Sequence, residues 1–142
     1  MAEASKTVEM KAKPEELWKV ITDYESYPKF LDTVHQAKVL SRDGNTVRVQ
    51  YSIELLGKEV TYILDHKEKA NEKMDWTLVE SNILKANTGG WVIHPLSSGK
   101  IEVTYNLSLE FKIFVPNIVL GGLVKSTLPS MLSQFEKQIH AA

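Results

Sequence analysis

The sequence predicts an α+β fold, a curved antiparallel sheet of about seven strands wrapped around one long C-terminal helix, with two short helices after the first strand. Two observations lead to this prediction. Residues 34–111 alternate apolar and polar side chains between turn signals, which is typical of antiparallel strands with one buried face. Residues 115–140 change to a helical period with a broad apolar stripe, and such a helix can cover that face. The length fits one domain, residues 1–142.

The N-terminal segment predicts one strand and two short helices. Residues 6–11, KTVEMK, alternate as a strand does. Pro14 suits the first position of a helix, and two glutamates follow it in the first turn, where the helix dipole favours negative charge. We expect this helix to end by about Tyr27, because the residue before Pro28 is disfavoured in the α region. The segment PKFLDTV, residues 28–34, is expected to begin the second helix.

Six further strands are expected, joined by short turns such as the Asp-Gly turn near position 44. They cover residues 34–41, 46–56, 58–69, 73–81, 88–95 and 101–114. The glycines of TGGW, residues 88–91, indicate a bulge or a close approach of two backbones. A phosphate-binding loop would need a lysine and a helix start after them, and neither follows.

The last segment predicts a long helix with weak points. Its apolar stripe consists of Leu120, Leu123, Val124, Leu128, Met131, Leu132, Phe135 and Ile139. Pro129 is expected to kink it, and Gly121 and Gly122 weaken its first turns. A sheet that bends away from this helix leaves a cavity, and these three residues would let the helix move as a gate over it.

The order of elements, together with the stretch AKPEELWKVITDYESYPKFL (residues 12–31), resembles the START/Bet v 1-like (SRPBCC) superfamily, the helix-grip fold. Within it, the chain is most similar to the coenzyme Q-binding (Coq10-like) and polyketide cyclase/dehydrase branch. The resemblance implies a cavity between sheet and helix that holds a lipid, quinone, polyketide or hormone. It also implies two alternatives: a polyketide cyclase or aromatase that uses the same cavity, and a protein-interaction module, since Coq10-like relatives include ribosome-associated proteins.

The stretch DYESYPKFL, residues 23–31, contains more aromatic residues than a helix exit needs. The resemblance assigns it to a turn that closes one end of the cavity. Tyr24 and Tyr27 would anchor this turn, and Phe30 and Leu31 would fill the core beside it.

A small-molecule pocket is mostly apolar, with a few polar groups that orient the ligand. The strands are expected to supply one wall, and the helix the other. The strand wall would contain Tyr51, Tyr62, Trp76, Trp91 and Tyr105, and the helix wall Leu120, Val124, Leu128 and Met131. The alternative is that the tyrosines place their hydroxyls at the edge of an ordinary core and the histidines lie in solvent.

Catalysis would need a general acid or base within reach of the substrate. The candidates are His66, His94, Tyr62 and Tyr105. Three glutamates fall on the polar strand faces, namely Glu54, Glu102 and Glu110, and this counts against an enzyme. The chain has no cysteine, and its four histidines lack metal-ligand spacing, so neither a metal site nor a cofactor is expected.

The bulk composition narrows the partners. A formal net charge of −1 and only two arginines, Arg42 and Arg48, argue against nucleic acid. The N-terminus lacks the apolar core of a secretory signal, and IVLGGLV is too short to span a bilayer. We therefore expect a cytoplasmic monomer or weak dimer that binds a hydrophobic small molecule and contacts membranes at most transiently.

Overall fold

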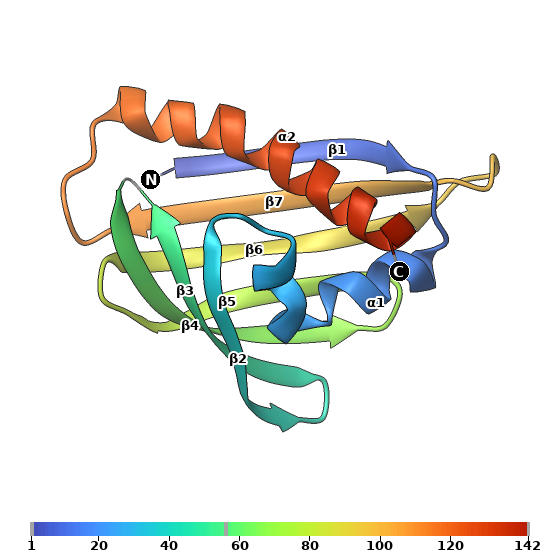
Figure 1. The fold of residues 1–142 in the computed structure, drawn as a ribbon, viewed down its shortest axis with the longest axis horizontal. Coiled ribbons are helices and arrows are strands. Elements are labelled where there is room, and N and C mark those ends of the chain that lie inside the picture. Colours follow the sequence, from blue (N-terminus) through green and yellow to red (C-terminus); the bar gives the residue numbers. More distant parts are fainter. Residues whose placement is uncertain (1, 56, 142) are drawn as a thin grey trace.

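The computed structural model describes residues 2–55 and 57–141, except for the side chains at positions 2 and 123–126. Within them, seven antiparallel strands form one curved sheet in the order β1-β7-β6-β5-β4-β3-β2, and a long helix lies across its concave face (Figure 1). The strands are β1 (Ala2–Met10), β2 (Val34–Asp43), β3 (Thr46–Leu55), β4 (Lys58–Lys69), β5 (Lys73–Ser81), β6 (Leu84–Pro95) and β7 (Ile101–Phe111). The helices are α1 (Pro14–Ile21), the 3-10 helix η1 (Tyr24–Lys29) and α2 (Asn117–Ala141). The predicted fold class is confirmed.

The order of strands in the sheet largely follows their order in the chain. Strands β2 to β7 form successive hairpins, and β7 also pairs with β1, so that β1 and β2 are the two edges. The alternation predicted for β3 is correct: Val47, Val49 and Tyr51 are all buried. The apolar faces of the strands share one core cluster with Leu132 and Phe135 of α2.

The first helix ends before Tyr27, as predicted, whereas the boundaries predicted for the second helix are wrong. Helix α1 ends at Ile21, well before Tyr27, and the Thr22 hydroxyl donates a hydrogen bond to the Trp18 carbonyl at 2.7 Å. A side chain that satisfies a carbonyl of the last turn stabilises the helix end at that point. The second helix, η1, contains Pro28 and ends at Lys29, where the sequence indicated a beginning.

Strand β6 begins at Leu84, earlier than predicted, and its glycines mark a close approach rather than a bulge. A Cβ on Gly89 would lie 2.3 Å from the Asn106 carbonyl oxygen and 2.6 Å from the Trp76 indole. The register irregularity of this strand lies near its start, between Leu84 and Ala86. Glycine at position 89 therefore lets the Trp76 ring approach the backbone of β6 closely.

Helix α2 continues without a break through Pro129. Leu128, Leu132 and Ile139 bury their side chains, as the stripe predicts. Among the described residues, no helix is both long and apolar enough to cross a membrane.

Candidate functional site

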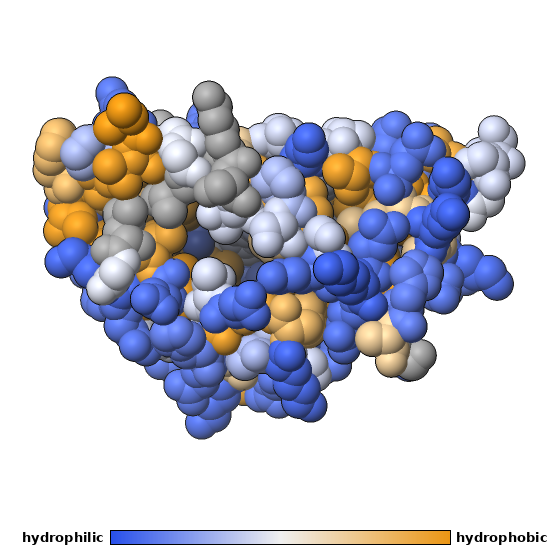
Figure 2. All heavy atoms as spheres, turned by 45° about the horizontal axis from the view of Figure 1, so that its top comes forward, coloured by the Kyte–Doolittle hydropathy of each residue, from blue (hydrophilic) through white to orange (hydrophobic). Residues whose placement is uncertain are grey.

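A cavity of about 460 Å³ lies between the concave face of the sheet and α2. Its lining residues come from η1 and its link to β2, from the first residue of β2, from strands β3 to β7, and from residues 127–135 of α2. The solvent-exposed members of the lining mark its mouth, and they are Asp32, Thr33, Glu54, Thr127 and Ser130. Figure 2 shows a hollow in the surface of this face, with hydrophobic side chains gathered to one side of it.

The cavity wall contains a closed circle of seven aromatic side chains, each in contact with the next. In order around the circle they are Tyr51, His66, Trp76, Tyr105, Trp91, Phe135 and Tyr27. Neighbouring ring centroids lie 4.8 to 6.2 Å apart. We call this set the aromatic ring. Its members come from seven different elements, because β3, β4, β5, β7, β6, α2 and η1 contribute one residue each.

His66 is the most polar member of the aromatic ring and is 3% exposed. Its Nε2 lies 2.8 Å from the Tyr51 hydroxyl, and its Nδ1 lies 3.2 Å from the sulfur of Met74. A thioether sulfur only accepts hydrogen bonds, so this geometry assigns the proton to Nδ1, and Nε2 accepts from Tyr51. Burial lowers the pKa of His66 from 6.5 to about 3. The imidazole is therefore neutral at pH 7.

Two further hydroxyls reach the cavity, those of Tyr62 and Tyr105. Burial raises the pKa of both, so both are neutral phenols. Within the described part of the chain, neither hydroxyl makes a hydrogen bond, whereas those of Tyr24, Tyr27 and Tyr51 all do. Hydroxyls in such a place are ordinarily satisfied by water or by a ligand.

Asn87 is a lining residue that sequence reasoning missed. It is 5% exposed, and its side-chain oxygen accepts a hydrogen bond from the Trp76 indole at 3.0 Å. This bond fixes the orientation of the Trp76 ring over Gly89. A buried strand position with a polar side chain was the available signal, but the strand was predicted to begin one residue later.

The structure brings together six of the nine residues predicted to line the cavity. They are Tyr51, Tyr62, Trp76, Trp91, Tyr105 and Met131. Leu128 instead packs into the core, and the half-buried Leu120 lies near the start of α2, away from the wall. The side chain of Val124 lies outside the described residues. Tyr27, which was predicted to anchor the turn, and Phe135, which was predicted only as part of the apolar stripe of the helix, also line the cavity.

Of the candidate acid–base residues, His66, Tyr62 and Tyr105 line the cavity, but His94 does not. His94 is exposed, because it alternates with the buried Trp91 and Ile93 and so points to the outer face of β6. The prediction for His94 is therefore wrong.

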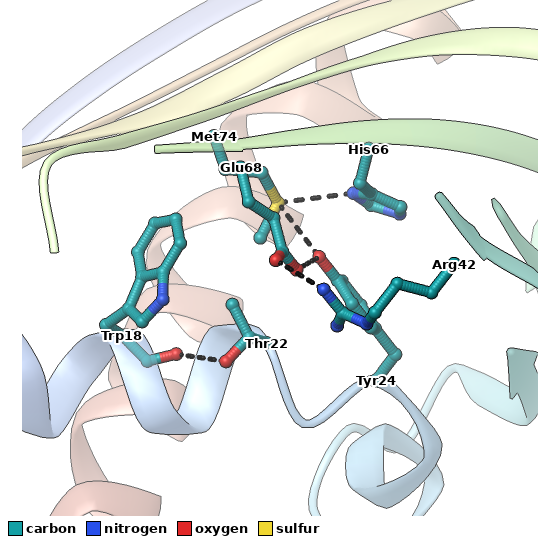
Figure 3. Close-up of polar contacts among 7 residues, drawn as sticks. All are labelled: Trp18, Thr22, Tyr24, Arg42, His66, Glu68 and Met74. Carbon is teal, nitrogen blue, oxygen red and sulfur yellow. Dashed lines mark hydrogen bonds and ion pairs between the residues drawn. The ribbon is translucent and has the colours of Figure 1, made fainter. Parts of the chain in front are cut away.

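The DYESYPKFL turn contributes Tyr27 and Leu31 to the cavity lining, and a polar anchor holds it to the sheet (Figure 3). The Tyr24 hydroxyl donates a hydrogen bond to Glu68 at 2.5 Å, and Arg42 pairs with the other oxygen of the same carboxylate at 3.0 Å. Burial and the Glu68 carboxylate raise the pKa of Tyr24. The Tyr24 ring also lies 4.6 Å from the His66 ring, so the anchor supports the aromatic ring from behind.

The mouth of the cavity is acidic. Asp32 and Glu54 lie on it, and Glu54 is 3.7 Å from His35, which is also 3.8 Å from Glu59. Among the described side chains, the polar groups on the α2 side of the mouth are all neutral, and they come from Thr127, Ser130 and Gln134. Among the described residues, no three histidine, cysteine or acidic side chains are placed to hold a metal ion.

The sequence model of the family described as "polyketide cyclase / dehydrase and lipid transport" matches residues 10–136, and the chain belongs to this family. Among curated proteins, it is similar to the ribosome association toxin RatA of Escherichia coli K12. The two are 22% identical over 145 residues, which cover 100% of this chain and 91% of RatA.

Solved structures share the fold. A START superfamily protein from Mycobacterium smegmatis gives a TM-score of 0.87 at 21% identity, over 99% of both chains. The Zhui aromatase/cyclase from Streptomyces sp. R1128 gives 0.85 at 12% identity, over 97% of this chain and 93% of Zhui. Together with the family and RatA, they confirm the predicted START/Bet v 1-like superfamily and its branch of Coq10-like and polyketide cyclase members.

Proposed function

We propose that this chain binds a hydrophobic small molecule with a flat aromatic part, as a carrier or sensor in the cytoplasm. The observation that carries the proposal is the aromatic ring, which lines a cavity of about 460 Å³. Burial of apolar ligand surface stabilises a complex by about 25 cal/mol per Å² before entropic costs. Contacts between aromatic groups add about 0.5–1.5 kcal/mol each.

The polar groups of the cavity would orient such a ligand. The hydroxyls of Tyr62 and Tyr105 face the cavity without partners among the described residues, and each can donate one hydrogen bond. Tyr51 already donates to His66, so its oxygen remains as an acceptor. Few polar groups on a mainly apolar wall are the usual arrangement in small-molecule sites.

The first experiment is native mass spectrometry of the protein purified from its own host, followed by organic extraction. A lipid, quinone or polyketide at about one molecule per chain would support the proposal and name the ligand class. Titration with the neutral fluorophore aminoanthracene then tests the site itself. We expect saturable binding that Met131→Trp abolishes by filling the cavity, and that Val92→Trp on the outer face of β6 leaves intact. Absence of binding in the unaltered protein would reject the proposal.

Ribosome association is a second candidate function. It is favoured by the similarity to RatA over the whole chain and by two nearly fully exposed apolar side chains, Phe114 at 89% and Ile118 at 86%. Large apolar side chains in such positions often belong to an interaction surface. Co-sedimentation with ribosomes of the source organism tests this function. Loss of co-sedimentation in Phe114→Ser with Ile118→Ser, but not in Val92→Ser, would support it, and no co-sedimentation of the unaltered protein would reject it.

A further inference from the structure

The distribution of charged side chains along the cavity wall affects which ligands can bind. Every ionised side chain on its described part is a carboxylate, Asp32 or Glu54, and both lie at the mouth. The inner part consists of aromatic and aliphatic groups, with neutral hydroxyls and an amide among them. The described lining therefore offers a ligand a neutral interior and a negatively charged mouth.

Resting on the proposed function, we infer that the cavity selects uncharged ligands, such as aromatic alcohols or ketones, and rejects the corresponding carboxylates. A ligand carboxylate could lie in only two places. In the interior it would lose its hydration among aromatic side chains, and burial of an ionised group without a partner is costly. At the mouth it would approach Asp32 and Glu54, which repel it.

A neutral polar group meets neither cost. Inside, it can hydrogen-bond to Tyr62, Tyr105 or Asn87, and at the mouth it can bond to Thr127, Ser130 or Gln134. These groups are phenols, hydroxyls and amides, which pair with alcohols, ketones and amides alike. The interior therefore tolerates polarity while it discriminates against negative charge.

Among the described interior groups, only His66 could reverse this preference by taking up a proton. Its hydrogen bonds and its burial oppose that change. Tyr51 on β3 donates to Nε2, the Met74 sulfur on β5 accepts from Nδ1, and the centroids of the Tyr24 and Trp76 rings lie 4.6 and 6.0 Å from that of His66. Two carboxylates of β4 lie close to it in the chain. Asp65 favours the protonated form but is paired with Arg48 and is outweighed by burial, and Glu68 is engaged by Tyr24 and Arg42. His66 therefore stays a neutral acceptor above about pH 5.

A matched pair of probes tests the inference: anthracenemethanol and anthracenecarboxylate, which share one ring system and differ in charge. We expect the carboxylate to bind at least about tenfold more weakly than the alcohol near pH 7.5. A carboxyl group has a pKa of about 4, so this probe stays ionised down to about pH 6, and the difference in affinity should persist from about pH 7.5 to about pH 6. The affinity of the alcohol should not depend on pH.

The variant Asp32→Asn with Glu54→Gln separates the two contributions. Removal of the two negative charges at the mouth should reduce the ratio of the two probe affinities several-fold. The affinities should still differ, because the neutral interior remains. Equal affinities for the two probes, or tighter binding of the carboxylate, would overturn the inference and leave the proposed function standing. If neither probe binds and the cavity stays empty with aminoanthracene as well, the proposed function itself fails.

Discussion

The neutrality of His66 makes stability depend on pH in a way that can be worked out from the structure. Burial lowers its folded-state pKa to about 3, whereas in the unfolded chain it is about 6.5. Between these values the unfolded state binds more protons, so the contribution to stability is fully present above about pH 6.5 and is lost as pH falls toward 3. From about pH 7.5 to about pH 5, this group alone should lower the free energy of unfolding by about 2 kcal/mol.

Urea unfolding of the unaltered protein and of His66→Gln at these two pH values measures this contribution. Glutamine does not titrate, and its amide oxygen can still accept the Tyr51 hydroxyl. The other titrating groups are common to both proteins and cancel in the difference. We expect acidification to destabilise the unaltered protein by about 2 kcal/mol more than the variant. An equal loss in both would show that His66 takes up its proton in the folded state, and would refute the neutral interior.

Three further perturbations test particular contacts. Gly89→Ala places a Cβ 2.3 Å from a backbone oxygen of β7, so urea unfolding should show a loss of about 3 kcal/mol or more. Gly121→Ala with Gly122→Ala meets open space and should stabilise α2 by up to about 1 kcal/mol per site. If α2 flexing gates the cavity, stopped-flow association of aminoanthracene should also slow in this variant, and unchanged rates would reject the gate. Tyr24→Phe removes the hydroxyl that binds Glu68 and should cost about 1–2 kcal/mol in the same unfolding assay, while an unchanged value would show that the anchor is not stabilising.

Much of the cavity wall could be predicted from the sequence, because strand side chains alternate. Tyr51, Tyr62 and Trp76 share their faces with aliphatic residues, and the structure places all three on the wall. The same alternation excludes His94, whose parity is opposite to that of Trp91; its position near a turn was the weaker argument. The pattern along each strand was therefore more reliable than proximity to a loop.

The helix wall was harder to predict, because an apolar stripe identifies core contacts rather than cavity contacts. The stretch of α2 that faces the cavity includes the polar residues Thr127, Ser130 and Gln134, whereas Leu128 fills the core beside it. A cavity can accept a polar side chain that a packed core would exclude. Nothing in the period of the helix distinguishes these two environments.

Closure of the aromatic ring could not be predicted at all. Phe135 meets Trp91 and Tyr27, which are distant from it in the sequence, at centroid distances of 4.9 and 5.5 Å. These contacts depend on strand register and on the path of α2 across the sheet. The apolar periodicity of a single strand or helix determines neither.

The chemistry of the closed ring bears on the choice between a binding protein and a cyclase. The description of the family covers cyclases as well as lipid transport, and a general acid or base works best with a pKa near the working pH. The pKa of His66 is far below neutrality, and its unprotonated nitrogen, Nε2, already accepts a hydrogen bond from Tyr51. Burial moves the pKa of Tyr105 in the opposite direction, away from proton donation.

Tyr105→Phe separates the two functions by size of effect. In a binding protein, the loss of one hydrogen bond should weaken ligand affinity about fivefold, from about 1 kcal/mol. In a cyclase that uses this hydroxyl for proton transfer, the rate should fall about a hundredfold or more with little change in affinity. The tyrosine hydroxyls and the imidazole of the interior are neutral and do not titrate near pH 7. Such groups orient a ligand well but exchange protons with it poorly, so we expect the fivefold loss of affinity rather than the hundredfold loss of rate.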